Sequence, residues 1–406
     1  MFEDVSNRRS ITIPDGVEEI GPATFAGCTK LVSIVIPDSV KSIGDYAFRG
    51  CTSLTSITIP DSVTKIGKGA FQGCTGLTDI TIPGTVTTIG AFVFGECEKL
   101  TRVVVSKGVT EIGNCTFRNC TGLTSVTIPD SVTSIGDLAF TGCTKLANII
   151  IPDSVTSIGQ FAFEDCRGLS SITIMDGVKN IGASAFSNCS KLTDITISGS
   201  ITKIEGYTFR NCYNLTRVTI PESVTEIGDF AFDGCTKLTD ITIPDSVISI
   251  GIGAFNNCSG LASITIPASV RCIERFAFDG CIGLTDIYVN QPESIRCCQQ
   301  RTKCIHHWRS RNWKVISAPC HCVFPDVCRK KRCRLCSDRD CCRKCRRNDH
   351  PYDLQFRLQR PDSAQKEEAH TTCNIAYQRS GCYHYRRNQH VQAGCVRSGR
   401  FFNHEG

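Results

Sequence analysis

The sequence predicts a β-dominated solenoid of stacked 23-residue coils, each with one short strand and one short helical turn. Recurring residues carry this prediction, because a fixed period of this length is typical of repeat architectures. Proline recurs at intervals of 23 residues or a multiple of 23, at Pro14, Pro37, Pro60, Pro83, Pro129, Pro152, Pro221, Pro244 and Pro267. Phenylalanine recurs without a gap, at Phe25, Phe48, Phe71, Phe94, Phe117, Phe140, Phe163, Phe186, Phe209, Phe232, Phe255 and Phe278. About twelve repeats therefore cover residues 6–290.

The strand lies early in each repeat. In the repeat "SITIPDSVTKIGKGAFQGCTGLT", Ile57 and Ile59 flank Thr58, which is the alternation expected of a half-buried strand. Pro60 ends this strand because it has no N–H to donate to a neighbouring strand.

The helical turn is expected later in the same repeat. Ala70, Phe71 and Cys74 have the spacing of one inward-facing helical turn, and Gly67 precedes it where the chain must bend. A unit of this length cannot enclose a core alone, so each coil must stack on the next. The cysteines share the inner face with phenylalanine, and we expect them to be small buried apolar residues rather than a redox or metal ladder.

The repeat resembles a known family. The run "LTSITIPDS" fits the leucine-rich-repeat frame L-x-x-L-x-L-x-x-N, with Ser62 where many repeats carry Asn or Cys. The phrase "IPDSVTSIGDLAFTGCTKL" resembles the BspA-type subfamily. The resemblance implies a right-handed solenoid with a parallel sheet along one face. It also implies a mostly secreted or surface-attached protein involved in adhesion and protein binding, and it brings no catalytic motif.

Composition divides the chain into two parts, residues 1–290 and residues 291–406. The first part holds 21 Lys and Arg against 29 Asp and Glu, whereas the second holds 24 against 10. All eight histidines, both tryptophans and half of the 28 cysteines lie in the second part. We expect residues 1–290 to form the solenoid and residues 291–406 to be an irregular or disordered basic tail.

The tail permits several interpretations. Cys333 and Cys336, and then Cys342 and Cys345, form two C-x2-C pairs, but their separation is shorter than the loop of a zinc ribbon. The basic residues could bind polyanions or nucleic acid by charge alone, and exported cysteines could form disulfides. A tail with little fold, or one produced by a shifted reading frame, fits the abrupt loss of the repeat. We assign no metal site and no cofactor here, and nucleic acid is not the partner we expect.

The beginning of the sequence aligns with the middle of a repeat. "MFEDVSNRRSITIP" matches "AFEDCRGLSSITIM" at 162–175, so Phe2 takes the phenylalanine position. We expect the chain to begin inside a coil, without a charged-then-apolar leader for secretion. No run of about 18 apolar residues is present, so no membrane span is expected. The location stays open in the sequence, although the resemblance implies an extracellular or cell-surface protein.

Candidate binding residues lie on the outward side of the predicted strands. Most of these positions hold Ser or Thr, and Arg102, Val104, Asn148 and Ile150 interrupt that pattern within three consecutive coils. Mixed apolar and Arg character is common at interface hot spots. Neutral divergence between near-identical repeats would give the same pattern. These residues are therefore either a binding site or a surface without a specific role.

Charged and aromatic exceptions occur elsewhere on the same outward side. We expect Asp79 to neighbour Arg102, and Arg217 to lie between Asp194 and Asp240 in an alternating row, either as contacts for a charged partner or as simple cross-strand pairs. Tyr288 is an aromatic exception at the last coil.

The sequence favours a non-catalytic scaffold. The repeats contain no histidine, and their carboxylates fall on regular surface positions instead of converging on one site. We expect a protein-binding or adhesive scaffold that recognises a protein or glycan through the outward strand face and the flanking turns, which vary most ("GDYAFRG", "GAFVFGE", "EGYTFRN"). The alternative is polyanion or nucleic-acid binding, with or without zinc, through the basic tail.

Overall fold

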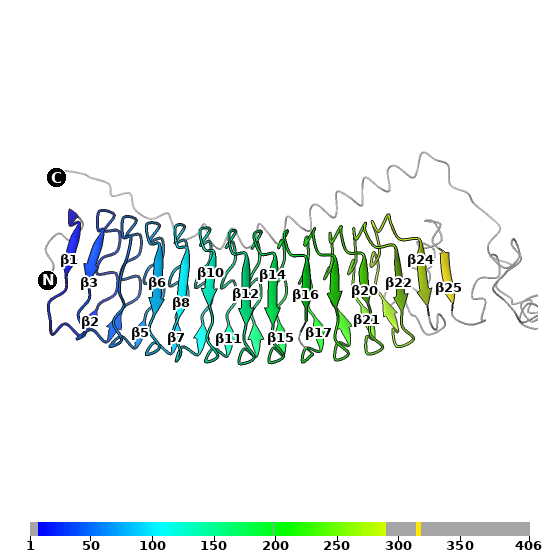
Figure 1. Ribbon diagram of the computed structural model, residues 1–406, viewed down its shortest axis with the longest axis horizontal. Coiled ribbons are helices and arrows are strands. Elements are labelled where there is room, and N and C mark those ends of the chain that lie inside the picture. Colours follow the sequence, from blue (N-terminus) through cyan, green and yellow to red (C-terminus); the bar gives the residue numbers. More distant parts are fainter. Residues whose placement is uncertain (1–6, 198, 290–313, 318–406) are drawn as a thin grey trace, which may run out of the picture. The chain divides into compact units, whose positions relative to one another are not determined.

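The repeats fold as successive coils of a parallel β-solenoid (Figure 1). The computed structural model describes residues 7–197, 199–289 and 314–317. The predictions for the rest of the tail, including both C-x2-C pairs, lie outside these residues. The first strand of each coil belongs to one face: β1 (Ser10–Thr12), β3 (Ser33–Val35), β6 (Asp79–Ile82), β8 (Arg102–Val105), β10 (Ser125–Thr127), β12 (Asn148–Ile151), β14 (Ser171–Ile174), β16 (Asp194–Thr196), β18 (Arg217–Thr219), β20 (Asp240–Thr242), β22 (Ser263–Ile266), β24 (Asp286–Val289) and β25 (Lys314–Ser317).

The register of this sheet follows the repeat. Within each of four ladders, the strands pair in parallel with the equivalent residues of the next coil, as Ser171 does with Asp194 and Ile172 with Ile195. The parallel sheet expected from the sequence is therefore confirmed. One strand from beyond residue 290 continues it, because β25 pairs in parallel with β24.

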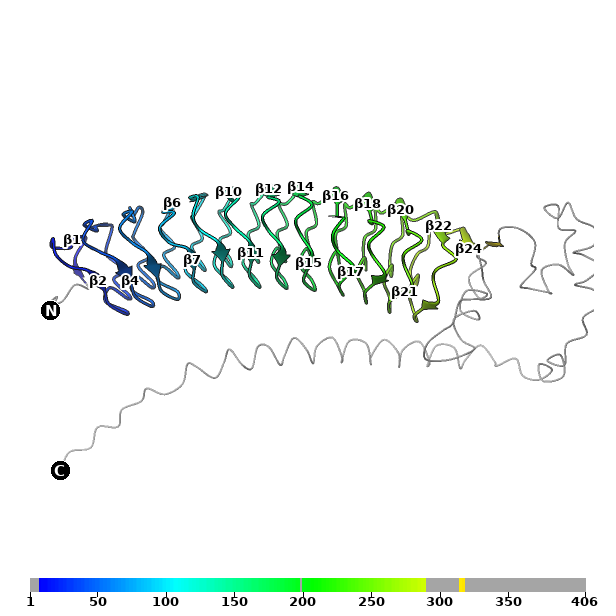
Figure 2. The ribbon, with the colours of Figure 1, turned by 90° about the horizontal axis from the view of Figure 1, so that it is seen from below.

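A second sheet, which the sequence analysis did not predict, runs along another side of the coils (Figure 2). Each of its strands has two residues, an outward residue followed by a buried isoleucine. They are β2 (Glu19–Ile20), β4 (Ser42–Ile43), β5 (Lys65–Ile66), β7 (Thr88–Ile89), β9 (Glu111–Ile112), β11 (Ser134–Ile135), β13 (Ser157–Ile158), β15 (Asn180–Ile181), β17 (Lys203–Ile204), β19 (Glu226–Ile227), β21 (Ser249–Ile250) and β23 (Cys272–Ile273).

The expected helical turn was wrong. No α-helix is present in the described residues, and this segment consists of successive turns. Backbone N–H groups alternate between two kinds of acceptor: Tyr46 donates to Lys68 of the next coil at 2.8 Å, and Ala47 donates back to Gly44 at 3.3 Å. A helix would need every N–H to bond within its own coil. The left-handed φ of 57° at Tyr46 also breaks helical geometry. The segment thus forms a third ladder between coils.

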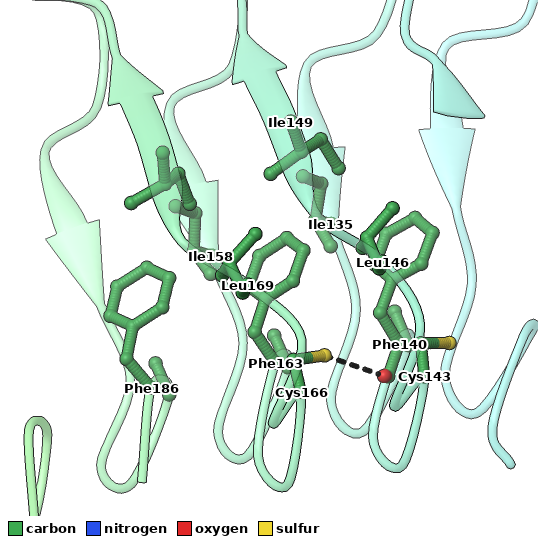
Figure 3. Close-up of a cluster of buried hydrophobic side chains, with 14 of the residues drawn as sticks. Ile135, Phe140, Cys143, Leu146, Ile149, Ile158, Phe163, Cys166, Leu169 and Phe186 are labelled. Carbon is green, nitrogen blue, oxygen red and sulfur yellow. Dashed lines mark hydrogen bonds between the residues drawn. The ribbon is translucent and has the colours of Figure 1, made fainter. Parts of the chain in front are cut away.

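The twelve recurring phenylalanines form one column through the core. Their rings are fully buried, and consecutive rings stack with centroids 5.1–5.6 Å apart. Figure 3 shows Phe140, Phe163 and Phe186 in this arrangement, with leucine and isoleucine packed beside them. Each fully buried large side chain stabilises the fold by about 1.5–3 kcal/mol, so this column is a main source of stability.

The recurring cysteines lie beside the phenylalanine column, and their expected burial is confirmed. Their thiols also do something the sequence analysis missed. The Cys166 thiol donates a hydrogen bond to the backbone carbonyl of Phe140 in the preceding coil, at 3.2 Å (Figure 3), and the N–H of Cys143 donates to the same carbonyl at 3.1 Å. Equivalent thiol bonds of 3.0–3.3 Å recur from Cys51 to Cys281. Cysteine here is a buried donor that joins adjacent coils.

We expect the column thiols to resist alkylation in the folded protein. Burial raises the pKa of the Cys97 and Cys212 thiols to about 12, and the thiolate is the form that reacts. Iodoacetamide at pH 8 should label Cys97, Cys143, Cys166 and Cys212 only as fast as the protein unfolds, as measured by mass spectrometry of digested samples. Rapid labelling of Cys143 or Cys166 without denaturant would contradict this account.

Candidate binding face

The outward side chains of the first sheet form the candidate binding face, called the strand face below. Along β14 the pattern is exposed, buried, exposed, buried, so Ser171 and Thr173 face solvent while Ile172 and Ile174 face the core. Because each strand repeats this pattern in register, equivalent outward residues align in columns along the coils. Exceptions to Ser and Thr in these columns therefore become local surface features.

Arg102 and Val104 are both outward residues of β8. Arg102 forms an ion pair with Asp79 of β6, with 3.3 Å between Nε and Oδ1, so the expected neighbour relationship is confirmed. Both side chains are largely exposed, and such pairs contribute about 0.2–1 kcal/mol. Val104 is half-buried and lies in register with Thr81 on one side and Thr127 on the other. The guanidinium keeps further donors free for another acceptor.

Asn148 and Ile150 lie on β12, one coil beyond β10. Both are exposed, and Ile150 has 62% of its surface in solvent. Thr173 takes the same place in the next strand. Ile150 and Val35 of β3, which is 57% exposed, are the two strongly exposed branched apolar residues of the threonine column. Together, Arg102, Val104, Asn148 and Ile150 place two polar and two apolar exceptions within three consecutive coils.

One of the three interruptions of the sheet lies inside this same patch, and the others lie between β3 and β6 and between β20 and β22. β10 pairs with β8, and β12 pairs with β14, but β10 and β12 belong to separate ladders. The inward residues Val126 and Ile128 are only half-buried, whereas the equivalent residues of the other described coils are buried. The sequence analysis missed this break, and no sequence signal marks it, because the 23-residue period is unchanged there.

Two predicted residues lie outside the patch. Arg217 is on β18 and pairs with Asp240 of β20, with 3.5 Å between Nε and Oδ2, while Asp194 is its register partner on the other side. Tyr288, on β24 and 39% exposed, lies at the opposite end of the repeats from β1. The structure brings together Arg102, Val104, Asn148 and Ile150, and leaves Arg217 and Tyr288 apart from them.

A row of mostly polar residues runs along the turns, each three residues after a residue with left-handed φ in the same coil. It includes Arg118, Glu164, Arg210, Asp233 and Asn256. Arg210 forms an ion pair with Asp233 of the next coil at 3.2 Å, and the Asp233 side chain is only 6% exposed. Asn256 donates to the other carboxylate oxygen of Asp233 at 2.9 Å. Burying this carboxylate requires such partners, so the row is a fixed network between coils.

Glu164 occupies the same row. Burial raises the pKa of its carboxyl to about 7, and the nearby charge of Asp165 adds to this effect, while Arg118 and Arg210 oppose it. A carboxyl that titrates near neutral pH can respond to small pH changes. Sequence reasoning had no means to single it out, because other coils carry polar residues of many kinds at this position.

Within residues 7–197 and 199–289, no three or more His, Cys, Asp or Glu side chains group in a way that could hold a metal ion. In the same part of the chain, no helix meets the length and hydropathy needed to cross a membrane.

Comparisons with known proteins give one consistent family. The profile of the BspA type leucine rich repeat region matches residues 1–124, 110–239 and 225–302. A leucine-rich repeat protein from Bacteroides ovatus is 35% identical with a TM-score of 0.67, over 76% of this chain and 77% of that one. A leucine rich cell surface protein from Faecalibacterium prausnitzii is 33% identical with a TM-score of 0.46, over 71% of this chain and 89% of that one. None of the curated proteins matches the chain.

We expect Glu164 to make stability depend on pH. Its pKa in the folded protein lies above its ordinary value of 4.5, so its stabilising contribution is complete below pH 4.5 and is lost as pH rises through about 7. Glu164→Gln should therefore gain melting temperature relative to the unmodified protein as pH rises from 4.5 to 7. Glu98→Gln, at an exposed glutamate, is the control. A difference in melting temperature that stays constant across this range would contradict the assignment.

Proposed function

Because the chain belongs to the BspA-type leucine-rich-repeat family, we propose that it is a non-catalytic scaffold that binds a protein or glycan partner through the strand face and the flanking turns. The family consists of repeat scaffolds, and repeat solenoids use extended surfaces for recognition. We also propose, from the family resemblance, that the protein is extracellular or attached to the cell surface.

The exposure of Ile150 is the observation that carries the proposal. Ile150 is 62% exposed in an outward column that mostly holds threonine, where Val35 of β3, at 57%, is the other strongly exposed branched apolar residue. Arg102 and Asn148 place hydrogen-bonding groups on the strands around it. A branched apolar anchor surrounded by an arginine and an amide is a composition that favours protein interfaces.

The break between β10 and β12 adds to this surface. Half-buried Val126 and Ile128 offer further apolar area directly beneath the outward residues. Where the two ladders separate, their edge groups do not pair with each other, so they are available to solvent or to a partner. The patch therefore combines apolar area with polar groups that a partner can satisfy.

The size of the strand face explains why the turns are included. Twelve coils at ~4.8 Å, with a width of about three residues, give a strip of roughly 600 Å². A standard interface buries about 800 Å² on each partner. A protein partner of ordinary size must therefore reach beyond the strands, and the turns are the most variable neighbouring surface.

The test begins with the full chain and a panel of purified extracellular-matrix proteins and immobilised glycans. For any binder, Arg102→Ala combined with Ile150→Thr should weaken the affinity at least tenfold, because it removes the donor and the apolar anchor. The melting temperature should stay nearly unchanged, since threonine is the common residue of that column and the ion pair is exposed.

A matched control lies beside the second sheet, at the residues that immediately precede β21 and β23. Ile248 is exposed and Arg271 follows it in the same outward column one coil later, so Arg271→Ala with Ile248→Thr makes the same chemical changes elsewhere. The control should keep full affinity. Equal affinity of both double variants would place recognition elsewhere. Binding that instead falls steeply with salt and ignores both variants would favour the polyanion alternative.

A further inference from the structure

Each coil has two positions with left-handed backbone, and the chain fills them in opposite ways. Apart from Glu96, the second position holds residues that tolerate this conformation: Gly27, Gly50, Gly73, Asn119, Gly142, Asp165, Asn188, Asn211, Gly234, Asn257 and Gly280. The first position, called the turn strip below, has φ of 51–62° and holds Ala23, Tyr46, Gly69, Phe92, Cys115, Leu138, Phe161, Ser184, Tyr207, Phe230, Gly253 and Phe276. Glycine, Asn and Asp adopt this conformation most readily.

The second position acts as an internal control for the first. Both sets occur in the same coils, with nearly the same φ, so the backbone favours the same residues at both. Large rings at a left-handed position are uncommon and carry a conformational cost. The choice of Tyr, Phe and Leu along the turn strip therefore reflects what the side chains contact.

Contacts within the chain account for only part of this choice. Tyr207 and Phe230 stack with their ring centroids 5.3 Å apart, and the Tyr46 ring lies over Gly69 of the next coil. Even so, 38% of Tyr207 and 41% of Phe276 remain in solvent. The strip is thus a ridge of rings that the solenoid itself only half covers.

Large and small residues alternate along the strip from Ala23 to Leu138, whereas Leu138 and Phe161, and then Tyr207 and Phe230, are large residues in adjacent coils. Gly69 separates Tyr46 from Phe92, and Cys115 separates Phe92 from Leu138. Ser184 and Gly253 do the same between the large residues further along. Because neighbouring coils lie about 4.8 Å apart, large side chains on alternate coils recur about every 10 Å.

Positively charged side chains lie beside several of the rings. The Arg49 guanidinium lies 5.6 Å from the centre of the Tyr46 ring, and the Lys68 ammonium lies 5.8 Å from that of Phe92. Arg210 and Arg275 lie in the same way against Tyr207 and Phe276. Asp45, in contrast, is engaged by the backbone N–H of Lys68 at 2.8 Å. Arg210 is already paired with Asp233, whereas Arg49 and Lys68 form no ion pair within the described residues. The side chains available beside Tyr46 and Phe92 are therefore hydrogen-bond donors with positive charge.

We propose that the turn strip binds an extended, proline-rich segment of a partner protein that carries acidic residues. This inference rests on the proposed function as a binding scaffold and names a partner class for its turns. A polyproline II helix repeats each face about every 9.3 Å, close to the two-coil spacing of Tyr46, Phe92 and Leu138, which form the part of the strip that this inference concerns. Its backbone carbonyls have no internal partners, so the cations beside the rings can donate to them.

Other partners fit less well. A β-strand cannot add here, because the strip's backbone groups are already bonded: Phe92 donates to Asn114 at 2.9 Å and accepts from Gly95 at 3.0 Å. An α-helix has its backbone carbonyls bonded internally, so only its side chains could accept from the cations. Sugars stack on ring faces, but Tyr207 and Phe230 cover each other's faces and present their edges.

The test uses the full chain and a fluorescent peptide of nine prolines with two glutamates at each end. A peptide of the same length with Gly and Ser in place of proline is the reference. Fluorescence anisotropy should show at least tenfold tighter binding of the proline peptide. Tyr46→Asn with Phe92→Asn should remove that difference, because the ring contacts are lost. Asn tolerates left-handed φ, so the melting temperature should change little.

Two further variants keep the result interpretable. Tyr213→Thr removes an exposed aromatic outside the strip and should leave peptide binding unchanged. Arg49→Ala with Lys68→Ala keeps the rings and the fold, and should weaken the peptide several-fold and reduce its salt dependence. If the Asn variant fails to fold, the variant with Arg49→Ala and Lys68→Ala tests the proposal in its place.

Equal binding of the two peptides would overturn the inference, as would proline binding that none of the strip variants alters. Binding of cello-oligosaccharides, lost in the Asn variant, would identify a glycan surface instead. The proposed function is tested separately by the strand-face double variant. A partner that still depends on Arg102 and Ile150, with no proline binding, would leave the scaffold intact and reject only this inference.

Discussion

Stacking of each residue on its counterpart 23 positions away is the constraint on which the rest of the structure depends. Every column must hold side chains that tolerate a copy of themselves, or a complement, in the next coil. Phenylalanine satisfies this by ring stacking, and cysteine does so by donating its thiol to a carbonyl one coil earlier. On the strand face, Arg217 lies between two aspartates. Opposite charges in adjacent coils avoid the repulsion that like charges would bring.

The same constraint explains what could be predicted. The period, the strand and the buried columns follow from residues that must recur, so Ile57, Phe71 and Cys74 were placed correctly on the inner side. The neighbour relationships of Arg102 with Asp79 and of Arg217 with Asp240 follow from the period alone. Four of the six candidate residues form one patch for the same reason.

The conformation of the turns could not be predicted in this way. Ala70, Phe71 and Cys74 have helical spacing, yet Phe71 donates its N–H to Val93 of the next coil at 2.9 Å. Bonding between coils competes with local helix formation and prevails because every coil offers the same acceptor. The two-residue strands of the second sheet were too short to leave an alternating pattern. The break beside β12 and the raised pKa of Glu164 depend on three-dimensional packing that the period does not determine.

A solenoid separates what holds it together from what it displays. Inward columns are shared by all coils, so a change at Phe163 acts on both neighbours, whereas an outward change acts mainly within its own column. Surfaces can therefore diverge while the core stays uniform. Specificity then depends on where the outward columns depart from the residue that the backbone favours. Ile150 departs from threonine on a strand, and Tyr207 departs from glycine or asparagine at a left-handed turn. The second departure also costs conformational energy in the backbone. A structural role alone therefore explains the residues of the turns less completely than it explains the residues of the strands.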